Sequence, residues 1–148
     1  MLIDTLIKLF QRDLNKLNTE VASYKKEENL WLLDKDINNS AGNLTLHLVG
    51  NLNHFIGTTL GHTGYVRQRD LEFSLKHVEK GKLLNQIEDT ISVVETTLKK
   101  LSEEDLQKQY PLIVFKEPMT ISYFLIHLTT HLAYHLGQIN YHRRLLDV

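Results

Sequence analysis

The chain has 148 residues, a length that suggests one domain with a core large enough to need no covalent staple. It contains no cysteine, which excludes a disulfide framework, a thiolate metal site and a cysteine nucleophile. The formal net charge is -1 with acidic and basic residues interspersed, so there is no electrostatic case for binding nucleic acid or an anionic membrane.

The first residues do not have the pattern of a targeting signal. Residues 1–5 carry no basic side chain, and Asp4 interrupts their apolar run. No stretch of about 18 uninterrupted apolar residues occurs, so we expect no membrane span. The expectation is a soluble, cytoplasmic protein.

Four segments have the apolar spacing of amphipathic helices, at about residues 2–26, 44–60, 81–101 and 121–146. Turn-forming residues at 38–43 precede the second segment, and Thr120 is placed to cap the fourth. Four long amphipathic segments with modest connections predict an all-α fold, a four-helix bundle that forms a single domain over residues 1–148.

The connections differ from one another. The apolar run that contains Leu30 and Trp31 can plug one end of the bundle or lie in an interface. Residues 70–80 are expected to be partly helical or irregular, and residues 102–105 to cap one short turn. Prolines bracket the β-branched segment 112–115, which predicts a short irregular or extended segment, or a small hairpin arm, before the last helix.

Histidines carry the main chemical hypothesis. His131 and His135 are four residues apart, which stacks their side chains on one helix face. His47 lies in the apolar stripe of the second segment and is the candidate third ligand. Three neutral imidazoles and an open position are the arrangement of a catalytic zinc site, and imidazole also suits nickel, copper and iron.

Other metal and catalytic motifs are absent. A zinc-protease helix has Glu directly after the first His, where this chain has Leu132. A ferritin-like di-iron site has Glu three residues before each His, where this chain has Leu128 and Leu132. The chain also has no P-loop, no GxGxxG and no G-x-S-x-G sequence.

Several residues near these histidines have more than one interpretation. His127 continues the track of His131 and can be a ligand, a partner that orients a ligand, or the floor of a pocket. Asn51 and Gln138 can orient imidazoles or be amides bonded to backbone. Arg67 and Arg69 can bind a carboxylate at a pocket mouth or lie in a solvated loop, and we expect the loop. The remaining histidines are expected to be hydrogen-bonded core residues or exposed, and these are His54, His62, His77 and His142.

Two stretches resemble the DinB/YfiT-like superfamily. Residues 120–139, with the pattern HxxxHxGQI, resemble its terminal motif, and residues 46–53 resemble its second-helix motif. The resemblance implies an up-down-down-up four-helix bundle, often a homodimer, that binds a divalent metal, commonly zinc or nickel. Matched residue by residue, the metal ligands are His47, His131 and His135.

Some members of that superfamily are transferases that use a low-molecular-weight thiol such as bacillithiol or mycothiol. Where those members tend to have histidine, this chain has Tyr134 and Gln138. The hypothesis is a metal-dependent enzyme, with thiol transfer first and hydrolysis or isomerisation second. The alternative is a non-catalytic stress-response or interaction module with a structural or vestigial metal site. A homodimer is expected, with the first and third long helices and Trp31 as candidate interface.

Overall fold

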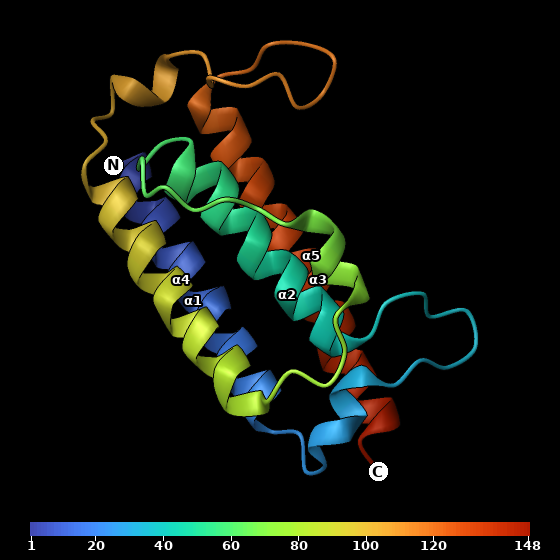
Figure 1. The fold of residues 1–148 in the computed structure, drawn as a ribbon. Helices are drawn as coiled ribbons and strands as arrows, with labels where there is room; N and C mark the ends of the chain where they lie inside the picture. The colour runs from blue at the N-terminus through green and yellow to red at the C-terminus, as the bar shows by residue number, and fades with distance from the viewer.

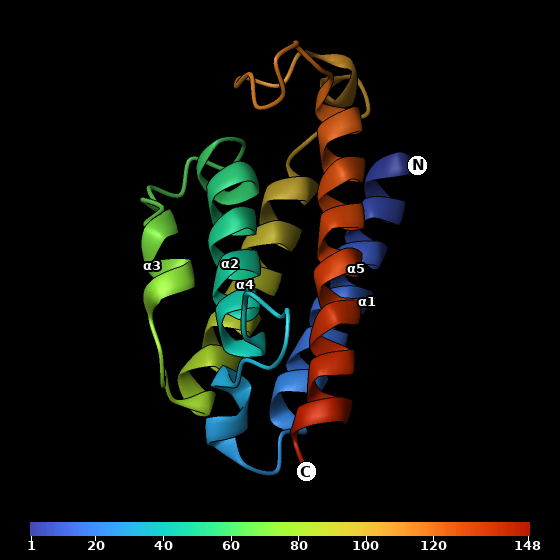
Figure 2. The ribbon, with the colours of Figure 1, turned by 90° about the vertical axis from the view of Figure 1, so that its right-hand side faces the viewer.

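The structure, a computed structural model that describes residues 1–148, is all-helical and contains no strand. Four long helical segments lie side by side, α1 with α4 and α5, and α2 with α4 and α5 (Figure 1). α1 and α5 run in one direction, and α2 and α4 run in the other (Figures 1 and 2). The helices and helical turns are α1 (Leu2–Ala22), η1 (Glu27–Trp31), α2 (Ala41–Leu52), η2 (Asn53–Thr58), α3 (Arg69–Ser74), α4 (Lys80–Lys99), η3 (Asp105–Gln107) and α5 (Ile121–Leu146).

The helix boundaries follow the sequence prediction with local differences. α1 ends at Ala22, four residues earlier than expected. α2 begins at Ala41 because the Ser40 side chain accepts the N–H of Asn43 and caps the helix there. The end of the second segment, η2, is π-helical rather than α-helical. Thr120 caps α5 as expected by accepting the N–H of Tyr123.

α2 is the most enclosed of the long helices, since all its residues except Val49 are buried. Its inner side packs against α4 and α5, and the short helix α3 lies along its outer side (Figure 2). A helix that is apolar around most of its circumference is a helix covered on several sides. His47 is therefore held in a protein interior, where its ring needs partners.

The structure distinguishes between the alternatives that the sequence left open for the connecting segments. Leu30 and Trp31 are buried, and a Cβ on Gly42 would lie 2.6 Å from the Trp31 ring, so this run closes one end of the helix assembly. Trp31 is therefore not an exposed interface residue. The segment before α5 is irregular, as expected. An isolated antiparallel β-bridge between Gln109 and Thr120 connects its two ends. No helix is both long and apolar enough to cross a bilayer.

Candidate metal centre

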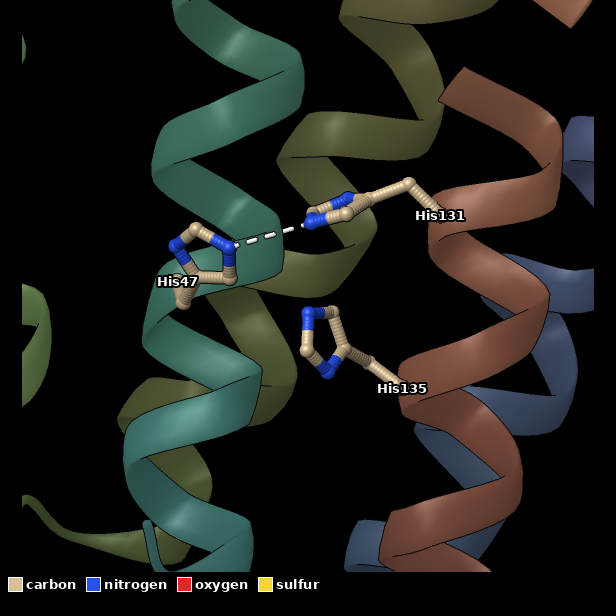
Figure 3. Close-up of side chains that lie close together, drawn as sticks. All are labelled: His47, His131 and His135. Carbon is tan, nitrogen blue, oxygen red and sulfur yellow. Dashed lines mark hydrogen bonds between the residues drawn. The ribbon is translucent and has the colours of Figure 1, made fainter. Parts of the chain in front are cut away.

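Three histidine side chains from two helices converge between α2 and α5. His47 comes from the middle of α2, and His131 and His135 lie one turn apart on α5 (Figure 3). One ring nitrogen from each of the three residues lies within 4.8 Å of the others, and the three residues form a group that could hold a metal ion. The structure thus brings together the three histidines that the sequence analysis selected.

Hydrogen bonds determine which ring nitrogen of His47 is free. His47 Nδ1 lies 3.0 Å from Glu72 Oε1 on α3, and an ionised carboxylate can only accept. Nδ1 therefore carries the proton and donates it, which leaves the Nε2 lone pair pointing at the cluster. His47 Nε2 lies 3.2 Å from His131 Nε2.

His135 Nδ1 also has a hydrogen-bond acceptor, but this acceptor is a neutral amide rather than a carboxylate. Its Nδ1 lies 2.8 Å from the side-chain oxygen of Gln138, one turn further along α5. An amide oxygen accepts, so Nδ1 donates and Nε2 is again the free nitrogen. Gln138 thus has the orienting geometry that the sequence analysis considered for it.

One pair of nitrogens in the group has the spacing of two ligands on a tetrahedral metal ion. Zinc–imidazole bonds of about 2.0–2.1 Å at tetrahedral angles place neighbouring nitrogens about 3.3 Å apart. The 3.2 Å between the Nε2 atoms of His47 and His131 matches that separation. The Nδ1 atom of His131 is buried without a hydrogen-bond partner.

Burial favours the neutral form of the two candidate ligands on α5, His131 and His135. Desolvation, with the neighbouring His135, His47, His127 and Arg67 adding to it, lowers the pKa of His131 to about 4. Desolvation also lowers the pKa of His135, partly opposed by its hydrogen bond to Gln138. Neutral imidazole is the form that binds a metal, so burial holds both rings in the protonation state that a metal ligand needs.

Glu72 contacts the cluster and was not among the candidates that the sequence indicated. Burial raises the pKa of this carboxyl, but the hydrogen bonds from His47 and Arg67, with the charge of Arg67, outweigh burial and hold the pKa below its usual range. Arg67 donates two hydrogen bonds to the two carboxylate oxygens, each 2.9 Å long. The expectation that Arg67 lies in a solvated loop is wrong, because its side chain is 11% exposed and committed to Glu72.

Two residues of α2 hold Glu72 in place. Gly50 lies one turn beyond His47, and a Cβ there would come within 1.9 Å of Glu72 Oε2. The Asn43 side-chain amide donates to the carbonyls of Glu72 and Leu75, at 2.9 and 2.8 Å, and so ties α3 to α2. Gly50 is the feature of the sequence that could have indicated this contact, since a glycine inside a helix often marks a place where another part of the chain packs closely.

The other candidate residues lie at the edges of the site. His127 is outside the three-histidine group, and its ring stacks on Phe124 and meets Phe115 edge-on, with ring centres 5.8 and 4.8 Å apart. Asn51 is buried, and its side-chain oxygen has no hydrogen-bond partner. His142 is a hydrogen-bonded core histidine, held by the Tyr24 hydroxyl and the Leu32 carbonyl, as the sequence analysis allowed.

A pocket of about 280 Å³ adjoins the cluster. His47 and His131 line it, together with His127, Asn51 and both Arg67 and Arg69. Phe115, from the irregular segment before α5, forms part of its wall. A cation held by the cluster would therefore have an accessible side that faces this pocket, as a catalytic site requires.

These features define an all-helical protein with a three-histidine cluster suited to a divalent metal ion. The chain belongs to the family described as "Protein of unknown function (DUF1572)", whose model matches residues 2–147. The comparison with curated proteins finds no match.

Proposed function

We propose that this chain is a divalent-metal-dependent enzyme of the DinB-like type, a single-domain four-helix bundle in which His47, His131 and His135 hold zinc or nickel. The observation that carries the proposal is the convergence of three ring nitrogens within 4.8 Å beside a pocket. A structural zinc site is typically closed by four protein ligands, whereas three ligands and an open side are typical of catalysis.

The reaction class we propose is thiol transfer, with hydrolysis or isomerisation second. A metal held by neutral imidazoles keeps its full positive charge, which lowers the pKa of bound water to about 7 and deprotonates a bound thiol. Glu72 accepts a hydrogen bond from His47 Nδ1 and so orients that ring, and the Gln138 side-chain oxygen does the same for His135. Phe115 and Phe124 give the pocket an apolar wall.

We propose a cytoplasmic homodimer, with an interface different from the one that the sequence analysis suggested. Trp31 is buried, whereas α5 presents several exposed aromatic and apolar side chains to solvent. These are Tyr123, Ile126, Tyr134, Tyr141 and Leu145. The same exposed residues support the alternative function, a non-catalytic interaction module.

The first test is elemental analysis of untagged protein purified without added metal, compared with the His131→Ala variant. About one zinc or nickel ion per chain, lost in the variant, is the expected result. The variant should stay helical because the core is a cluster of 28 buried apolar residues that includes none of the three histidines. Wild-type protein that contains no metal and takes up neither zinc nor nickel would overturn the proposal.

Thermal unfolding with and without a chelator separates the two functions. A structural metal contributes directly to folding, so its removal should lower the melting temperature markedly. A catalytic metal in a preformed helix assembly should change the melting temperature much less. A large loss of stability on chelation would favour the interaction module.

A further inference from the structure

The pocket beside the three histidines has a charge unlike that of the whole chain. The chain carries a formal net charge of -1. Yet each ionisable side chain that lines this pocket is a base: His47, Arg67, Arg69, His127 and His131. His131 is neutral and Arg67 is paired with Glu72, so the guanidinium of Arg69 is the positive charge that this lining offers to a ligand. A positive charge in a concave site attracts anions.

The two arginines of the pocket differ in what they can still bind. Arg67 is neutralised by Glu72 through two hydrogen bonds. Arg69 is exposed and forms no ion pair; its guanidinium lies over the Phe73 ring, 5.2 Å from the ring centre. His127 adds ring nitrogens that form no hydrogen bond within the chain. Arg69 and His127 are thus the unoccupied donors.

We infer that this pocket binds a small monoanionic molecule, a carboxylate with an apolar body, through Arg69. One unneutralised guanidinium matches one negative charge and pairs with a carboxylate in a bidentate geometry. Phe55, Phe115 and Phe124 offer aromatic walls to the apolar body. A volume of about 280 Å³ lies at the lower end for ligand pockets, so the molecule is small. The inference deepens the proposed function, because it names the class of molecule that would meet the metal.

A second pocket beside the cluster lacks the basic lining of the first. It lies on the His135 side of the cluster, has a volume of about 490 Å³ and includes Asp36, His142 and the amides of Asn38 and Asn39. It has no lysine or arginine in its lining. The anion is therefore expected on the His47 and His131 side.

The test compares two probes of the same shape, 3-phenylpropionate and 3-phenylpropanol, by calorimetric titration of the protein after chelator treatment and again after loading with zinc. Arg69→Gln is the test variant. Arg144→Gln is its matched control, because Arg144 is also exposed, also lies over an aromatic ring, that of Tyr141 at 5.1 Å, and lines neither pocket.

The wild type and Arg144→Gln should bind the acid about three- to ten-fold more tightly than the alcohol, and added salt should reduce that preference. In the metal-free protein, Arg69→Gln should bind both equally. Equal binding in the metal-free wild type, a preference that survives in metal-free Arg69→Gln, or no binding of either probe overturns the inference. Because the titration is also done without metal, failure to load zinc bears on the proposed function alone.

Discussion

The two sides of the histidine cluster are built differently. On the α2 side, His47 is backed by a buried carboxylate, which is in turn held by Arg67 and fitted against Gly50. On the α5 side, His131 and His135 are placed by helix geometry, with a single exposed amide, Gln138, behind one of them. One ligand of the cluster is therefore positioned by tertiary charge pairing, while the other two are positioned by their spacing along one helix.

The largest expected effect follows from removing the negative charge behind His47. Glu72→Gln keeps the shape of the side chain but leaves Arg67 without its counter-ion and makes His47 a weaker ligand. Zinc affinity, measured by competition with a chromogenic chelator, should fall about 10- to 100-fold.

The matched variant on the other side is Gln138→Ala, which removes a neutral, exposed acceptor from His135. Its loss of zinc affinity should be clearly smaller than that of Glu72→Gln. Equal losses in the two variants would show that the two sides of the cluster do not differ in the way described.

The next effect concerns the fit between α2 and α3. Gly50→Ala places a methyl group where Glu72 Oε2 now lies, so the carboxylate must leave Arg67 and His47. The variant should lose about 1–3 kcal/mol of unfolding free energy in urea denaturation. Its zinc affinity should fall as well.

Gly137→Ala on α5 is the control for Gly50→Ala. No atom lies within 4 Å of the added methyl group, so the alanine should stabilise the helix by about 0.5–1 kcal/mol. If both variants were stabilised, the packing of Glu72 against Gly50 would not be a constraint.

The α5 side should also show a pH dependence of stability. The pKa of His131 is about 4 in the folded chain and about 6.5 when unfolded, so between these values the unfolded chain binds more protons. Protonation then favours unfolding, and the metal-free protein should lose stability as pH falls from about 6.5 towards 4, with no effect of this group above that range.

Urea denaturation at several pH values measures this dependence. The His131→Gln variant removes the titrating ring from the cluster and should have a flatter profile than the wild type between pH 6.5 and 4. Parallel profiles for the two proteins would contradict the assignment of this slope to His131.

Much of the fold was accessible from local patterns. Apolar periodicity with the Thr120 cap predicted a helix at residues 121–146, and the structure has α5 at Ile121–Leu146. The shift in the start of α2 depends on one side chain, Ser40, that competes with neighbouring turn formers as the cap. The π-helical end of that segment lies against α4, and the apolar spacing of the sequence does not distinguish it from a continuing α-helix.

By itself, the sequence determined that His131 and His135 share one face of a helix, because a spacing of four residues fixes their relation wherever the helix lies. It also identified His47 as a polar residue in an apolar stripe. The contacts of Glu72 and Arg67 behind His47, and the position of Arg69 over the Phe73 ring without an ion pair, come from the tertiary structure. Those contacts join α2 to α3 through space, and no periodicity along the chain encodes how a short helix docks on a long one.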